Sequence, residues 1–536
     1  TGDVVMNAGL NLGLYQFFLG QPVISTGGNI SLSSTDGFIA LTGIYNARDL
    51  EISSLQGSFS GEQVEINAEG NVGIHLQNGA VDFTGGNMTV NAGSFSVTAR
   101  ELQLGGVTIN TDTSKGSGDI TLIATGSDSE FDIWMPTINP DGIFTTGDLF
   151  VSALAEGGSV RIGDTGSGIP QRYGFINLSG SARFDVAGDL QLPEINTSNV
   201  QGDRDIVLNV GGTVHQNHDL FTGGANYIAT ASEFVFGDGV QINTDYLNET
   251  QDALTGSGNV VIETSSDQSD LYLPNIVTQV NCVDVGSCGT LKVSGANNVS
   301  AEGNIRISGD AIFDVSGDLQ IVGNDRAPLG KDNRLSSVRI LNAQKVDIFN
   351  NGDLTLDGVN AESLSLNILG NIDQTGSLNI AGETSIVAAP DTNIDLSNPL
   401  NDFNVLSVQS TGASVINITD SGAITLSNLN LDGTGQGGVL SVTAASITQA
   451  ENSGILLQDS AQLNLTGDFI TLGANGTATV DINGAVLNGV FASDFNVQGA
   501  IRGAAGVVDA QLAGFYVNGS AADNFVEIAV GASITG

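Results

Sequence analysis

The chain has 536 residues, with 58 Asp and Glu against 15 Lys and Arg, and a formal net charge of −43 at pH 7. This charge repels phosphate backbones and anionic lipid headgroups, which argues against nucleic acid and membrane surfaces as partners. Hydrophobic residues make up 40% of the chain, so it has enough apolar surface to fold.

Glycine dominates the composition, with 72 copies beside many Asn, Asp, Ser and Thr. These residues favour turns and disfavour long helices, which predicts a nearly all-β protein. The length exceeds that of one ordinary core, so we expect growth by repetition. No apolar run reaches about 18 residues, and the start has neither a basic segment nor a Met. We therefore expect a mature or excised piece without membrane insertion.

A corner motif of Gly, then Asn or Asp, then an apolar residue recurs along the chain. Because Gly, Asn and Asp tolerate positive φ, the motif predicts tight corners between short strands. Its copies begin at Gly28, Gly70, Gly86, Gly118, Gly147, Gly258, Gly303, Gly352, Gly370 and Gly467.

Strands between the corners are short and closely spaced, with successive starts at Val338, Val346, Leu354 and Leu364. Sandwiches and barrels also show this spacing, but only a solenoid repeats the same pattern of strands and corners over such a length. We predict an all-β fold, a right-handed parallel β-helix (β-solenoid) forming an elongated rod. At about 20 residues per coil, the chain would make about 27 coils and be on the order of 130 Å long.

A block of about 130 residues occurs twice in the sequence. FDVAGDLQL at 184–192 returns as FDVSGDLQI at 313–321, residues 94–112 match 227–245, and 116–136 match 256–274. We predict four segments: N-terminal coils in 1–92, a first copy in 93–223, a second copy with a cysteine loop in 224–345, and further coils in 346–536.

Residues 369–449 carry a more specific pattern. Its signals are Ile372 with Gln374, the NIAGET stretch at 379–384, Asn401-Asp402-Phe403, and Ile-Thr-Gln at 447–449. This segment resembles the shaft repeats of filamentous-haemagglutinin-like adhesins, large bacterial exoproteins exported by two-partner secretion. That family's export domain, with its Asn-Pro-Asn signatures, is not visible in this chain. The resemblance implies an extracellular protein, secreted or on the cell surface, and a bacterial origin.

Two cysteines, Cys282 and Cys288, lie six positions apart among turn-forming residues. Such spacing predicts a small disulfide loop in an oxidising compartment, with two free thiols as the alternative. A metal site there would need more ligands than the stretch offers.

Several stretches are candidate catalytic sites. Asn110-Thr111-Asp112 and Asn243-Thr244-Asp245 resemble one polygalacturonase motif, but that family's other motifs are absent and both copies belong to the duplicated block. We interpret them as structural corners. His215, His218 and Asp219 could hold a metal or move a proton, but residues 215 and 218 would face opposite sides of a strand. The third histidine is His75.

The remaining motifs point to structure rather than cofactors. GTGQGG at 433–438 runs into a strand, whereas dinucleotide binding needs a helix there. Acidic corners such as GSDSEFD at 126–132 could bind Ca²⁺ weakly, and no other cofactor is expected. We expect Trp134 and the phenylalanines to pack in the core.

These observations predict an extracellular structural and adhesive β-solenoid, the shaft of a bacterial surface adhesin or a fibre subunit assembling end to end, and not an enzyme. Expected partners are further copies of the chain, other surface proteins and cell-surface carbohydrate. The alternative is a polysaccharide-active β-helix enzyme, a lyase or hydrolase, although lysines and arginines are sparse for such a groove.

Overall fold

The computed structural model describes most of the chain. The described residues are 2–14, 22–112, 114–126, 131–135, 143–163, 175–197, 204–245, 256–266, 269–278, 288–301, 303–323, 332–433, 437–483, 485–498, 500–503, 515–519, 525–528 and 533–535. They divide into two compact units, Thr1–Gly295 (unit 1) and Ala296–Gly536 (unit 2).

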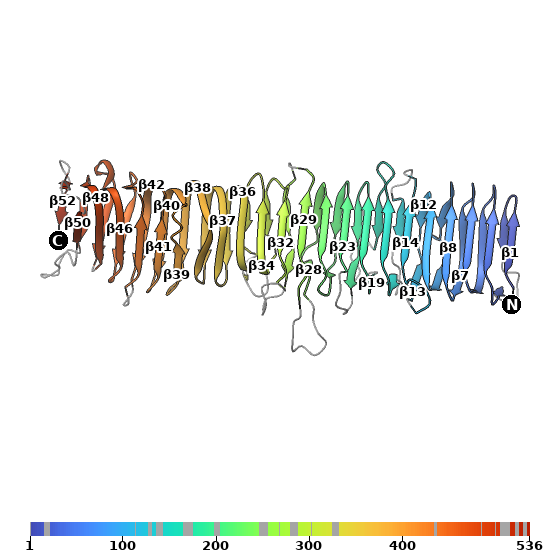
Figure 1. Cartoon of the computed structure of the whole chain (residues 1–536). Helices are drawn as coiled ribbons and strands as arrows, with labels where there is room; N and C mark the ends of the chain where they lie inside the picture. Colours follow the sequence, from blue (N-terminus) through green and yellow to red (C-terminus); the bar gives the residue numbers. More distant parts are fainter. Residues whose placement is uncertain are drawn as a thin grey trace. The chain divides into compact units, whose positions relative to one another are not determined.

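Each unit is a β-solenoid in which strands of successive turns pair in parallel, as the stacked arrows of Figure 1 show. The three sides of a turn in unit 1 build three columns of strands, which confirms the predicted fold class. The first column contains β1 (Val4–Ala8), β4 (Ile30–Ser34), β6 (Leu50–Ser54), β8 (Asn71–Leu76), β11 (Ser94–Ala99), β14 (Ile120–Ala124), β17 (Leu149–Ala153), β20 (Ala182–Val186), β23 (Ile206–Val210), β26 (Tyr227–Ala231), β29 (Val260–Thr264) and β32 (Leu291–Ser294).

The second and third columns share β5 (Ile39–Ala47) and β7 (Phe59–Ala68), which bend from one side of the solenoid to the next. The second column also contains β2 (Leu12–Leu14), β9 (Ala80–Asp82), β12 (Glu101–Gln103), β15 (Ile133–Met135), β18 (Val160–Ile162), β21 (Leu190–Leu192), β24 (Thr213–Gln216), β27 (Glu233–Phe236) and β30 (Leu271–Leu273). The third contains β3 (Val23–Ser25), β10 (Met88–Ala92), β13 (Val107–Thr111), β16 (Ile143–Thr145), β19 (Phe175–Leu178), β22 (Glu194–Thr197), β25 (Leu220–Phe221), β28 (Gln241–Asn243) and β31 (Asn275–Val277).

Unit 2 combines short strands with long ones of up to 17 residues, whose pairing contains shifts of register. In chain order they are β33 (Val299–Ala301), β34 (Ile305–Asp314), β35 (Leu319–Ile321), β36 (Arg334–Asn350), β37 (Leu354–Ile368), β38 (Ile372–Ala388), β39 (Asn393–Leu396), β40 (Asp402–Thr411), β41 (Val415–Thr419), β42 (Ala423–Asp432), β43 (Val439–Thr443), β44 (Ser446–Gln449), β45 (Gly454–Gln458), β46 (Gln462–Leu472), a short 3₁₀ turn (Ala474–Gly476), β47 (Thr479–Asn483), β48 (Val486–Val497), β49 (Ala500–Gly503), β50 (Phe515–Gly519), β51 (Phe525–Ile528) and β52 (Ser533–Thr535).

Alternation of apolar and polar residues determines which side chains enter the core. In β4, Ile30 and Leu32 are fully buried, while the alternate residues Ser31 and Ser33 face outward. Because the strands pair in register, each buried side chain stacks on its equivalent in the next turn, as Ile30 does on Leu50. Each such burial is worth about 1.5–3 kcal/mol.

The length of a turn varies more than the sequence suggests. In the first column of unit 1, Ile30 pairs with Leu50, whereas Leu149 pairs only with Ala182, a much longer step along the chain. In unit 2 a turn takes fewer residues than either of these, since Leu354 pairs with Ile372. The strands on either side of the longer step keep their parallel pairing without a shift of register. Unit 1 therefore makes fewer turns than a uniform repeat of about 20 residues would give.

The copied stretches of the sequence occupy equivalent positions in unit 1. Successive strand pairings connect Ile109 in the first copy with Ile242 in the second, five turns later. In the first column it leads in the same way from Ile120 to Val260. The repeated block therefore corresponds to five turns over this part of unit 1. The proposed four-segment division of the chain stays a prediction.

Most corner glycines allow neighbouring turns to pack closely, whereas the sequence predicted that they would provide positive φ. Only Gly118 and Gly352 among the described corner motifs have positive φ, and none of the motif's Asn or Asp residues does. Instead, a Cβ on Gly258 would overlap the carbonyl oxygen of Ala225, and one on Gly467 would lie 2.6 Å from that of Ala444. Successive turns approach so closely at the corners that a side chain does not fit.

An Asn or Asp at a corner, either within the corner motif or at the equivalent position of another turn, connects one turn to the next. The side-chain oxygen Oδ1 of Asn226 accepts the backbone N–H of Asn259 at 2.8 Å, and Oδ1 of Asn259 accepts that of Thr290 at 3.0 Å. The same bond recurs in unit 2, where the N–H of Asn371 donates to Asp353 at 2.7 Å. We call this series the corner ladder; it satisfies N–H groups at the points where strand pairing stops.

Replacing a corner glycine should destabilise the solenoid. We expect Gly258→Ala to lower the free energy of unfolding by about 1–3 kcal/mol, the usual cost of forcing atoms into a packed site. Gly256→Ala is a matched control, because a Cβ at Gly256 meets nothing within 4 Å. Urea denaturation followed by circular dichroism measures both. Equal stability of the two variants would contradict this account of the corner.

Candidate functional site

The residues that carry the adhesin resemblance form buried corners in unit 2. Oδ1 of Asn401 accepts the backbone N–H of Leu378 at 2.9 Å, and its amide donates to the side chain of Gln374 at 3.1 Å. Oε1 of Gln449 accepts the N–H of Gly473 at 2.8 Å. Asn401 and Gln449 are fully buried, so these signals report on how turns stack rather than on a binding site.

The two Asn-Thr-Asp stretches, interpreted as corners from the sequence, lie where a strand ends and a corner begins, because Asn110 and Thr111 belong to the end of β13 and Asn243 ends β28. The hydroxyl of Thr111 donates to the carbonyl of Gly118, and the hydroxyl of Thr244 donates to that of Gly258 at 2.7 Å. Asn110 belongs to an outward ladder of amides, in which it donates to Asn91 at 3.0 Å. The threonine hydroxyls thus make buried contacts between neighbouring parts of the backbone.

The pKa values of the two aspartates of these stretches shift in opposite directions. Hydrogen bonds from the backbone and side chain of Ser114 lower the pKa of Asp112. Burial raises the pKa of Asp245 to about 6, although a hydrogen bond with Ser257 opposes the shift. Because the copies differ in this way and lie five turns apart, they do not form a pair of catalytic carboxylates.

The histidine cluster is also a corner. Strand β24 ends at Gln216, so His218 lies outside the strand, and the side-chain amide of Gln216 donates to the carbonyl of His218 at 2.6 Å. Oδ1 of Asp219 accepts the N–H of Gln241 at 2.8 Å. His215 faces outward from β24.

Some predicted features fall on residues that are not described. Cys282 lies outside the described residues, so its disulfide with Cys288 stays a prediction. The middle parts of GTGQGG and GSDSEFD also lie outside them. Within the described part of the chain, no group of three or more His, Cys, Asp or Glu side chains is arranged to hold a metal ion.

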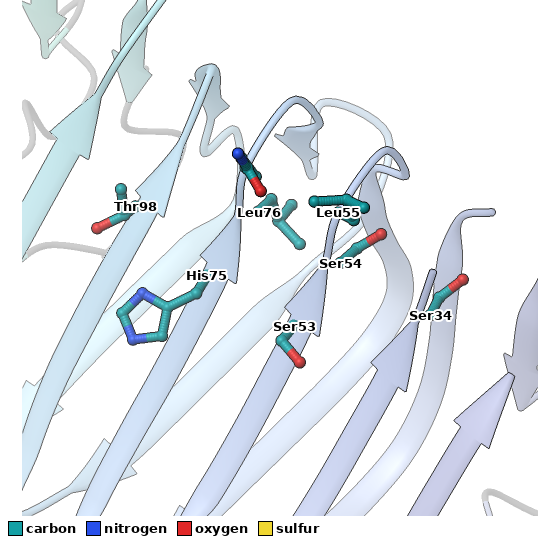
Figure 2. A pocket seen from close by; sticks show the side chains of 8 residues that line it. Ser34, Ser53, Ser54, Leu55, His75, Leu76 and Thr98 are labelled. Atoms are coloured by element: carbon teal, nitrogen blue, oxygen red, sulfur yellow. The ribbon is translucent and has the colours of Figure 1, made fainter. Parts of the chain in front are cut away.

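One candidate surface is a hydroxyl-rich depression on the first column of unit 1 (Figure 2). It has a volume of about 360 Å³ and lies over β6, β8 and β11, where Ser53, His75 and Thr98 occupy the same position in successive turns. Small side chains and an imidazole could bind hydroxyl groups or water here.

The imidazole of His75 lies beside an acidic partner. Its Nε2 is 3.6 Å from Oε1 of Glu51, and the two side chains are 54% and 47% exposed. Partial burial raises the pKa of Glu51, and His75 opposes this shift. The separation exceeds the distance of about 2.6–3.2 Å of a direct hydrogen bond, and the pair is open to solvent, so the attraction between the two side chains is weak.

A second candidate surface is a row of large side chains on the second column of unit 1. Trp134 pairs with Arg161, Arg161 with Gln191, and Gln191 with His215, one residue per turn. We call these four residues the aromatic row. The prediction that Trp134 belongs to the core is wrong. Trp134 is the middle residue of β15, whose neighbours Ile133 and Met135 occupy the interior, so alternation directs its indole outward.

Neighbouring residues hold the aromatic row in place. The guanidinium of Arg161 lies 5.3 Å from the ring centroid of Phe131, a cation–π distance. The indole lies close to the backbone of Gly105, since a Cβ on that glycine would be in ordinary van der Waals contact with Cζ3 of Trp134 at 3.5 Å. A depression of about 190 Å³ adjoins the row and is lined by Phe131, Asp189, Gln191, His215 and Asn217.

Sequence reasoning missed the aromatic row because it lies across four turns. Its members follow one another at unequal steps along the chain, and this irregularity hides the shared position until the register is known. The available signal was local: in Ile133-Trp134-Met135 the tryptophan stands between two core residues.

Comparisons with known proteins agree with a repeat architecture. A family described as repeats of unknown function (DUF5649) matches residues 343–410, from within β36 to within β40. No curated protein and no solved structure matches the chain. The likeness to filamentous-haemagglutinin-like adhesins therefore rests on the sequence motifs alone. In the part of the chain that the structure describes, no helix has the length and hydrophobicity of a transmembrane segment.

The raised pKa of Asp245 predicts that the stability of the folded protein depends on pH. Its folded pKa of about 6 lies above the ordinary value of about 3.9, so folding loses stability as pH rises from about 4 through 6. Asp245→Asn removes the charge and should raise the melting temperature at pH 7.5 but have less effect at pH 4.

The equivalent Asp112→Asn variant is the control for this measurement. Because the pKa of Asp112 is lowered, its replacement should give no gain at pH 7.5. Thermal unfolding of both variants across pH 4–7.5 measures the difference. A melting temperature of Asp245→Asn that follows the native protein at every pH would contradict the raised pKa.

Proposed function

We propose that this chain is an extracellular structural and adhesive segment of a bacterial surface protein, and that it is not an enzyme. The observation that supports this proposal is the in-register stacking of outward side chains. It gives unit 1 lateral faces that present one side chain per turn, as in the amide ladder and the aromatic row. Repetition of this kind suits binding to repetitive or extended partners.

Charge supports a role outside the cell that depends on ionic conditions. Several of the few cations are already paired with aspartates, such as Arg183 with Asp185 at 2.8 Å and Lys345 with Asp347 at 2.6 Å. Acidic residues far outnumber basic ones in a chain of net charge −43, so copies of the chain repel one another. Millimolar Ca²⁺ or seawater-like salt would reduce this repulsion and favour assembly into fibres.

Solubility tests the electrostatic part of the proposal. The isoelectric point is about 4.1, and repulsion between copies disappears as the carboxylates are protonated. We expect a sharp loss of solubility below about pH 4.5, measured by light scattering and sedimentation. A solubility curve that stays flat from pH 7 to pH 4 would count against charge repulsion as the barrier to association.

Electron microscopy and activity screens test the functional class. Purified protein is expected to form filamentous assemblies in millimolar Ca²⁺ and to remain as single particles without it. Incubation with pectin, alginate and related polymers is expected to release no product. Turnover of any of these polymers would support the polysaccharide-active enzyme instead.

A further inference from the structure

We propose that the aromatic row, Trp134, Arg161, Gln191 and His215, is a binding site for a neutral, extended polysaccharide. The proposal rests on the adhesive function proposed above and assigns to it a ligand class and four residues. The site lies wholly within unit 1, on strands β15, β18, β21 and β24.

Spacing is the first argument. Neighbouring strands of a sheet lie about 4.8 Å apart, so the row presents one side chain per turn at that interval. An extended chain of β-linked hexopyranoses advances by a similar distance per sugar. Consecutive sugars could therefore meet consecutive side chains without bending of either partner, and little conformational entropy would be lost on binding.

The chemistry of the row is the second argument. An outward indole offers an apolar face for the C–H groups of a pyranose ring. Arg161 offers a fork of N–H donors for hydroxyl groups, and Gln191 and His215 add donors and acceptors. An aromatic platform beside planar polar groups matches a sugar ring, which has an apolar face and a rim of hydroxyl groups.

Arg161 is the most informative member of the row. The chain has far more acidic than basic residues, yet no ion pair or hydrogen bond of Arg161 is found among the described residues, and its Nε is buried without a partner there. Its guanidinium lies over Phe131 instead, which fixes its orientation beside Trp134. Stacking of this kind presents the guanidinium edge to a ligand rather than neutralising it.

Charge around the row selects against acidic polymers. Gln103, which pairs with Trp134, is preceded in the column by Asp82, and Asp189 lines the adjoining depression. These carboxylates, added to the net charge of the whole chain, repel a polyanion such as polygalacturonate. A neutral polysaccharide meets no such repulsion.

Trp134 is the only tryptophan of the chain, so its fluorescence reports directly on this site. The experiment titrates the full chain with cellohexaose, xylohexaose and mannohexaose, and with hexagalacturonate as the acidic probe. We expect a saturable change in tryptophan emission with at least one neutral hexasaccharide and none with hexagalacturonate. Calorimetric titration confirms the affinity independently of fluorescence.

Variants locate the binding site. Trp134→Ala and Arg161→Gln should each weaken calorimetric binding about tenfold, and Trp134→Tyr should restore part of the loss. Phe150→Ala is the matched control, because Phe150 also faces outward in unit 1 but from β17 in the first column. Circular dichroism and melting temperatures should stay those of the native protein, since these side chains lie outside the core.

Three results would overturn the inference: no neutral hexasaccharide binds at millimolar concentration, only hexagalacturonate binds, or Phe150→Ala weakens binding as much as Trp134→Ala. None of them bears on assembly or solubility, which test the proposed function separately. A failure of glycan binding at this site is therefore distinguishable from a failure of the adhesive shaft itself.

Discussion

The structure depends on the hydrogen bonding of backbone N–H groups at the corners, where strand pairing stops. A turn can stack on the next only if these groups find acceptors, because an unpaired buried N–H costs about 1–3 kcal/mol. In unit 1 the acceptor is often the side chain of an Asn or Asp in the preceding turn, as with Asp119 and the N–H of Asp148 at 2.9 Å. Gly147, which precedes the donor Asp148, lets the turns approach closely enough for this bond, since a Cβ there would lie 2.5 Å from Oδ1 of Asp119.

Unit 2 meets the same requirement with buried side chains as well. Asn350 accepts the N–H of Leu335 at 2.7 Å, and Oδ1 of Asp420 accepts that of Phe403 at 2.7 Å. Burial, assisted by the charge of Asp402, raises the pKa of Asp420, which its backbone hydrogen bonds oppose. In both units the corners and the core provide the connection between turns, so outward side chains such as those of the aromatic row remain available for other roles.

Much of the fold could be predicted from the sequence because its causes are local. Alternation such as Ile30-Ser31-Leu32 predicts a half-buried strand, and recurrence of the Gly-Asn-apolar motif predicts corners. The reason for each corner glycine could not be predicted, since the obstructing atom, such as the carbonyl of Ala225 facing Gly258, belongs to another turn. The aromatic row was hidden for the same reason: register across corners of variable length decides which residues become neighbours.

Amide hydrogen exchange at a single corner tests the central claim most directly. The account predicts that the N–H of Asn259 is protected in the native chain and exchanges at least tenfold faster in Asn226→Ala, which lacks its acceptor. Asn209→Ala is the control, because Asn209 faces outward from β23 and its side chain donates to Asp185 instead. Equal protection of Asn259 in the native chain and in Asn226→Ala would contradict the corner ladder as the connection between turns.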